Sequence, residues 1–98
     1  MTTYSVLTDD EKDDIIVNFT RAQERDHYCH SINLERYDEM LKTLPTGDFR
    51  NDIEKRKADT QSRIAEVEKI LEATAAQMPD AARIEAAMQR IKTAESVK

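Results

Sequence analysis

The residues best suited to chemistry lie in one short stretch, Glu24-Arg25-Asp26-His27-Tyr28-Cys29-His30. Its imidazoles, thiol and carboxylates are side chains that bind transition metals. Glu24 and His27 have the Glu-x-x-His spacing of di-iron helical bundles. Asp26 and His30 share one helix face, from which His27 points away. A di-iron site needs a second such motif, which only a second copy of the chain could supply, so we expect no metal at His27 and His30 and no cofactor.

Cys29 is the only cysteine in the chain. As a nucleophile it would need a base, but His30 is turned about 100° further around the helix. We therefore expect Cys29 to be a small buried residue and the chain to be no enzyme, with no catalytic residue. A single cysteine also excludes an internal disulfide and favours a reducing compartment.

The composition is that of long amphipathic helices or a coiled coil. Charged residues make up 36% of the 98 residues, and there is one glycine. A chain of this length forms one domain at most, with a small core. We expect an all-α fold in which residues 1–98 form a single helical domain.

Charge is spread unevenly along the chain. Residues 1–48 carry five basic and eleven acidic side chains, whereas residues 49–98 carry ten basic and nine acidic ones. This difference favours pairing between the two halves, and the absence of a basic face argues against nucleic-acid binding. No apolar run is long enough to span a membrane and no signal peptide is recognisable, so we expect a cytoplasmic protein with no membrane partner.

Leu44-Pro45-Thr46-Gly47-Asp48 divides two long segments that lack glycine and proline. Proline disfavours helical geometry at the residue before it, and glycine permits a positive φ. The sequence therefore predicts a long antiparallel helical hairpin that turns within residues 44–48, with no β-strand.

The first helix is predicted over residues 9–44, and Thr8 and Glu11 form a capping box at its start. Its acidic first turns suit the helix dipole. An eleven-residue repeat predicts nearly straight or slightly right-handed packing and fits better than a seven-residue one, which would place Arg36 in the seam. The predicted inward stripe is Ile15, Phe19, Ala22, Asp26, His30, Asn33, Tyr37, Leu41 and Leu44.

The second helix is predicted over residues 48–78, capped by Asp48 or, alternatively, by Thr46. Folding about Thr46 places Leu41 near Ile53. The pairs Asp52 with Arg56 and Asp59 with Arg63 have favourable spacing, and Glu35, Asp38 and Glu39 face Lys55, Arg56 and Lys57. The predicted stripe is Phe49, Ile53, Arg56, Thr60, Ile64, Val67, Leu71, Ala75 and Met78.

A shorter third helix is predicted over residues 80–96, with Pro79 in its first turn. Its apolar stripe is Ile84, Met88, Ile91 and Ala94. If this helix folds back over Ile15, Ile16, Phe19 and Leu71, it forms a three-helix bundle at the open end and leaves a coiled-coil-like arm. The alternative is a kink at Pro79 that projects the helix into a neighbouring subunit.

Residues 1–7 are predicted to form an extended arm that docks on a neighbouring molecule. The arm alternates apolar and polar residues, which suits a segment with one buried face. A two-helix arm also leaves apolar side chains half-covered, and such patches mark interfaces. The candidate interaction residues are Tyr4, Val6, Leu7, Tyr37, Leu41, Phe49 and Ile53.

These features favour a non-enzymatic structural or interaction subunit of a larger protein assembly, with a viral (phage) particle as the preferred example. We expect protein partners, with the chain either a homo-oligomer or one subunit among others. Two alternatives stay open. The first is a metal-binding helical dimer using Glu24, His27 and His30, and the second is a small inhibitor of a host protein.

Overall fold

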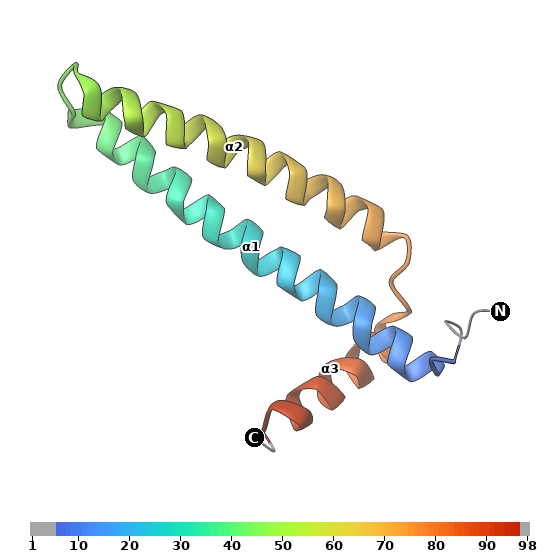
Figure 1. Ribbon diagram of the computed structural model, residues 1–98. Coiled ribbons are helices and arrows are strands. Elements are labelled where there is room, and N and C mark those ends of the chain that lie inside the picture. The colour runs from blue at the N-terminus through green and yellow to red at the C-terminus, as the bar shows by residue number, and fades with distance from the viewer. Residues whose placement is uncertain (1–5, 97–98) are drawn as a thin grey trace. The chain divides into compact units, whose positions relative to one another are not determined.

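The computed structural model describes residues 6–96, which form three helices: α1 (Asp9–Thr43), α2 (Asp48–Ala75) and α3 (Ala81–Ser96). The fold is all-α, as predicted. α1 and α2 pack along each other as a hairpin, and α3 contacts α1 (Figure 1). None of these helices is long and apolar enough to cross a membrane.

The chain separates into two compact units. The hairpin unit is Gln23–Leu71, and it contains most of α1 and α2. The three-helix unit combines Met1–Ala22 with Glu72–Lys98, so the start of α1 and all of α3 belong to it. Each unit has its own few buried side chains and its own charged contacts.

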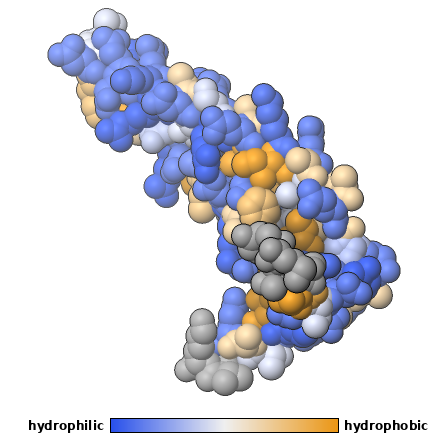
Figure 2. Space-filling model, turned by 45° about the vertical axis from the view of Figure 1, so that its right-hand side comes forward, coloured by the Kyte–Doolittle hydropathy of each residue, from blue (hydrophilic) through white to orange (hydrophobic). Residues whose placement is uncertain are grey.

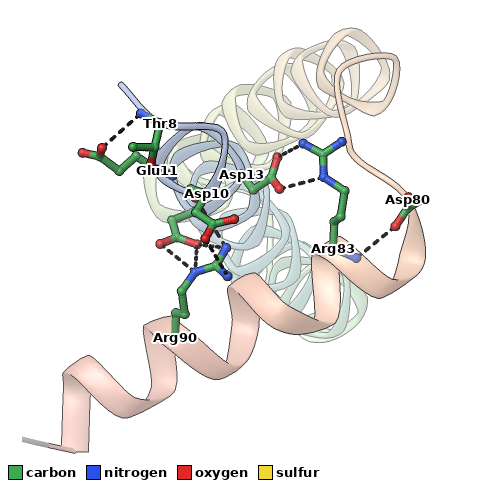
Figure 3. Close-up of polar contacts among 8 residues, drawn as sticks. Thr8, Asp10, Glu11, Asp13, Asp80, Arg83 and Arg90 are labelled. Atoms are coloured by element: carbon green, nitrogen blue, oxygen red, sulfur yellow. Dashed lines mark hydrogen bonds and ion pairs between the residues drawn. The ribbon is translucent and has the colours of Figure 1, made fainter. Parts of the chain in front are cut away.

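The capping box at the start of α1 is confirmed. The Thr8 amide donates to Glu11 Oε1 at 3.0 Å, and the Glu11 amide donates to Thr8 Oγ1 at 3.1 Å (Figure 3). The Thr8 carbonyl also accepts the first helical hydrogen bond, from the Lys12 amide. These bonds satisfy amides that would otherwise lack partners at the helix end.

The hairpin turn lies where the sequence predicted it, between Thr43 and Asp48. Its cap differs from the prediction, because the Gly47 carbonyl accepts from the Asn51 amide at 3.0 Å. Gly47 is therefore the residue that precedes the first helical turn, and Asp48 lies inside the helix. Gly47 has a φ of 154°, which L-residues rarely adopt and glycine adopts readily.

Arg50 closes the same turn from the other side. Its Nη1 donates to the carbonyl oxygens of Leu41 and Leu44, each at 2.8 Å. These carbonyls lie at the end of α1, where no amide follows to bond them. The Arg50 Nε also donates to Glu54 Oε1 at 3.2 Å. One half-buried arginine thus joins the end of α1 to the first turns of α2.

The seam between α1 and α2 repeats every seven residues. Half-buried or buried side chains recur alternately three and four residues apart, the spacing of coiled-coil packing. In the hairpin unit they are Gln23, His27, His30, Leu34, Tyr37, Leu41 and Leu44 on one side and Arg50, Ile53, Lys57, Thr60, Ile64, Val67 and Leu71 on the other. In the three-helix unit the series continues with Ile16, Thr20, Thr74 and Met78.

The predicted eleven-residue stripe is wrong at seven of its positions, while its other positions are half-buried or buried. Ile15, Phe19 and Phe49 were expected inside but are 57%, 41% and 58% exposed. Four further predicted positions are also exposed, namely Ala22, Asn33, Arg56 and Ala75. The error arose because the eleven-residue repeat has one residue too many before His30. Ile15 and Phe19 therefore each fall one residue before a seam position.

The predicted pairing of the helices is supported by charged contacts. Lys57 Nζ lies 2.7 Å from Asp38 Oδ1, as the expected juxtaposition of acidic and basic residues requires. The predicted pair of Arg56 with Asp52 is also present, at 2.9 Å. Arg63 differs, since it contacts Glu66 and Asp26.

The segment between α2 and α3 is longer than predicted, because α2 ends at Ala75 and not at Met78. The Gln77 amide bonds the Thr74 carbonyl at 2.9 Å, which tightens the last turn. α3 is capped by Asp80, whose Oδ1 accepts from the Arg83 amide at 3.0 Å (Figure 3). Pro79 therefore precedes the cap and does not lie in the first helical turn.

The core is small in both units. Val17 and Ala87 are buried in the three-helix unit, and Ile53 and Val67 are buried in the hairpin unit. In α3 the sequence pointed to Met88, which is 38% exposed, and missed Ala87, which is fully buried.

We predict that Gly47→Ala lowers the free energy of unfolding by about 1–3 kcal/mol, the usual cost of a strained backbone conformation. An added Cβ would meet no atom within 4 Å, so the cost comes from the φ of Gly47 and not from a clash. Urea unfolding followed by circular dichroism measures the change. Thr46→Ala, at the exposed neighbouring position, is the control. Equal stability of the Gly47→Ala variant and the original chain would contradict the prediction.

Candidate interaction surfaces and charged contacts

The acidic start of α1 binds the arginines of α3. Asp13 is the most enclosed of these carboxylates, with a side chain 8% exposed. Arg83 contacts it through two hydrogen bonds, from Nε to Oδ2 at 2.9 Å and from Nη2 to Oδ1 at 2.8 Å (Figure 3). Such a two-pronged contact fixes the orientation of both side chains.

Arg90 makes the second contact between α3 and α1. Its Nη2 lies 2.7 Å from Asp14 Oδ1. Its Nη1 lies 3.8 Å from Asp10 Oδ2, and Figure 3 labels both Arg90 and Asp10. Ala87 lies between the two arginines in sequence and is fully buried. The fold-back of the third helix was expected to cover Ile15 and Phe19. Instead α3 meets α1 at the acidic residues, and this corrects the predicted packing.

These contacts raise the pKa values of both arginines. Hydrogen bonding with Asp13 raises the pKa of Arg83, and hydrogen bonding with Asp14 raises the pKa of Arg90. A raised pKa in the folded chain means that the stabilisation is fully present below the ordinary arginine pKa and is lost only when pH rises through the higher folded value. Both arginines therefore keep their charge at every physiological pH.

The histidines of the hairpin unit lie in two separate charged contacts. His30 Nε2 lies 3.3 Å from Asp26 Oδ1, and Arg63 Nη2 lies 3.3 Å from Asp26 Oδ2. His27 Nε2 lies 3.5 Å from Glu68 Oε2 on α2. The sequence placed His27 away from the stripe that holds His30, but both are half-buried seam residues.

This arrangement does not gather the proposed metal ligands. Glu24 is exposed, while His27 and His30 each contact a different carboxylate. Over residues 6–96, no three side chains of the His, Cys, Asp and Glu types lie close enough together to hold a metal ion. Cys29 was expected to be buried, and it is exposed.

Three large apolar side chains at the start of α1 or just before it are left exposed. We use the name α1 apolar face for Ile15 and Phe19 on α1 together with Leu7, which precedes the helix, all in the three-helix unit. Ile15 is 57% exposed, Phe19 41% and Leu7 38%. A groove of about 340 Å³ runs beside them, lined by Leu7, Lys12, Asp13, Ile15, Ile16 and Gln77. By contrast, the surface around the hairpin turn is mostly hydrophilic on the face drawn in Figure 2.

The predicted interaction residues have different outcomes. Val6 and Phe49 are exposed, at 77% and 58%. Tyr37 and Leu41 are half-buried in the seam. Ile53 is only 4% exposed, so it belongs to the core and adds nothing to a surface patch. Tyr4 lies outside the described residues.

The exposed residues that the sequence missed are Ile15, Phe19 and Tyr28. Ile15 and Phe19 were expected to pack inside the hairpin, and Tyr28 received no role. A strict seven-residue repeat through the polar positions would have placed all three outside the seam. The exposure of these residues could have been predicted from the seven-residue spacing of the seam, but not from the hydrophobicity of their side chains.

We predict that Arg83→Met lowers the melting temperature by several degrees, and by more than Arg90→Met does. Arg83→Met strands the buried Asp13 carboxylate, whereas the Asp14 side chain is 33% exposed and can be hydrated. Thermal unfolding followed by circular dichroism measures both effects.

The double variant Asp13→Leu with Arg83→Met tests the cause. It removes both charges together, so it should recover much of the loss seen with Arg83→Met alone. If the double variant is as unstable as Arg83→Met, then a stranded carboxylate is not the reason for the loss.

The chain was also compared with protein-family models, with curated proteins and with solved structures, and none of them matches. Its function must therefore be argued from its own surfaces and contacts. The strongest of these surfaces is the α1 apolar face.

Proposed function

We propose that this chain is a non-enzymatic subunit of a protein assembly and that it binds another protein through the α1 apolar face. The observation that carries the proposal is the exposure of Ile15 and Phe19 on adjacent turns of one helix. Apolar surface gains roughly 25 cal/mol per Å² when it is removed from water. Exposed apolar clusters of this kind are typical of protein interaction sites.

The charged contacts support a binding role because they already have a structural use. Asp13 and Asp14 bind the arginines of α3. His27 and His30 contact carboxylates in the hairpin unit. Each of these groups already has a partner within its own unit, and in the three-helix unit the contacts of Asp13 and Asp14 hold α3 against the helix that carries the α1 apolar face.

The proposal covers more than one biological setting. A structural component of a larger particle, including a viral one, and a small inhibitor of another protein would both use an exposed apolar helix face. A particle component and an inhibitor would bind different proteins, so identifying the bound protein distinguishes these two settings. The alternative of a metal-binding dimer has no observation in its favour among the described residues.

We predict that a photoreactive phenylalanine analogue placed at position 19 crosslinks one defined protein in cells that naturally make this chain. Mass spectrometry identifies the crosslinked protein. The same analogue at position 55, an exposed site on α2, is the matched control. Ile15→Ser should reduce the crosslink several-fold, because it removes apolar contact area beside the probe.

Two outcomes would overturn this proposal. One is the absence of any specific crosslink from position 19. The other is a crosslink that Ile15→Ser leaves unchanged, because the partner would then be held elsewhere. A crosslink to a second copy of the same chain would identify that copy as the occupant of the α1 apolar face.

A further inference from the structure

A second surface lies on α1 in the hairpin unit. A groove of about 490 Å³ is lined by Ile32, Glu35, Arg36, Glu39 and Met40, all from α1. His30 and Leu34 are half-buried in the seam. Each helical residue turns by about 100°, so Ile32 lies on the opposite side of α1 from these two residues. The groove is therefore on the face of α1 turned away from α2.

The charges on this face are arranged symmetrically about Ile32. Arg25 lies seven residues before it and Glu39 lies seven residues after it. Seven residues are close to two helical turns, so Arg25, Ile32 and Glu39 lie along one line on α1. The two ends of this line carry opposite charges, and its centre is apolar.

Such a line is complementary to a second copy of itself running in the opposite direction. In an antiparallel pair related by a two-fold axis at Ile32, Arg25 faces the partner's Glu39. Symmetry repeats this ion pair at the other end, as it must in an isologous interface. In a parallel pair the same positions would oppose like charges, which is destabilising.

The flanking residues fit the same arrangement. Tyr28 and Glu35 lie on one side of the line, and Cys29 and Arg36 lie on the other. A two-fold axis perpendicular to the plane of the paired helices leaves Tyr28 and Glu35 of both copies on the same side of the interface. Tyr28 of one copy therefore lies beside the partner's Glu35. The Tyr28 hydroxyl can then donate to the partner's Glu35. Tyr28 is 67% exposed in the single chain, so its ring offers apolar area at this contact.

The charged groups of this face are available for such contacts. Within residues 6–96, no ion pair involves Arg25, Glu35 or Arg36. Glu39 contacts Lys42 at 2.8 Å, but both side chains are largely exposed. Exposed pairs of this kind contribute little, so Glu39 can exchange Lys42 for an arginine of a partner.

From these observations we propose that a second copy of this chain docks along the Ile32 face, meaning Arg25, Tyr28, Ile32, Glu35, Arg36 and Glu39. The two copies form an antiparallel two-fold dimer. The dimer goes beyond the function proposed above, because it uses different residues from the α1 apolar face. Both surfaces can be occupied in one assembly.

Charge exchange tests the dimer directly. Sedimentation equilibrium gives the dimer dissociation constant for the original chain, for Arg25→Glu, for Glu39→Arg and for the double variant. Each single change opposes like charges at two symmetric places and should weaken the dimer about tenfold or more. The double variant restores opposite charges and should recover affinity to within a few-fold. Lys55→Glu, on the exposed surface of α2, should leave the dimer unchanged.

A disulfide placed on the axis gives a second measurement. Ile32→Cys in a Cys29→Ser background should form an oxidised dimer rapidly, because residue 32 faces itself across the axis. Lys55→Cys in the same background should not. A chain that stays monomeric at several hundred micromolar would overturn the proposal. So would a double charge variant no tighter than the single variants.

The test also separates this dimer from the function proposed above. Ile15→Ser with Phe19→Ser should leave the dissociation constant of the dimer unchanged while it removes the crosslinked partner. If that variant instead dissolves the dimer and the charge exchanges do not affect it, the second copy docks on the α1 apolar face. In that case the Ile32 face is not the interface.

Discussion

A hairpin of two helices can bury only one narrow stripe on each helix, and the rest of the structure depends on this constraint. In the hairpin unit only Ile53 and Val67 among the described hydrophobic residues are buried. The remaining seam positions are half-exposed, so polar side chains such as His27 and Lys57 can occupy them and keep their charged ends hydrated. Burial of apolar area is therefore modest, and hydrogen bonds at the ends of the helices help to fix the fold.

The features that could be predicted from the sequence are those set by neighbouring residues. The capping box of Thr8 and Glu11 needs only its own four residues, and it forms as predicted. The turn at Gly47 follows from the backbone freedom of glycine next to a proline that stops the helix. The approximate pairing of α1 with α2 was also predictable, because a short turn between long helices leaves little choice of register.

The features that could not be predicted depend on contacts between distant residues. Arg50 looks like any surface arginine in the sequence, yet it binds the last carbonyls of α1. Asp13 looks like one more acidic residue at a helix start, yet it is buried against Arg83. The eleven-residue repeat inferred from the sequence likewise led to a stripe through Ile15 and Phe19 that the fold leaves outside. Those two residues are for the same reason the part of the candidate site that the sequence missed.

The exposure of Ile15 and Phe19 follows from the position of Asp13. Turning α1 far enough to bury these two side chains in the seam would move Asp13 away from Arg83, and it would replace a paired carboxylate with an unpaired one. Losing one partner of an enclosed ion pair costs more than an exposed apolar side chain gains by partial burial. The α1 apolar face is thus maintained by the contact that positions α3. A partner can cover Ile15 and Phe19 without disturbing either the seam or the Asp13–Arg83 pair, because these two side chains belong to neither.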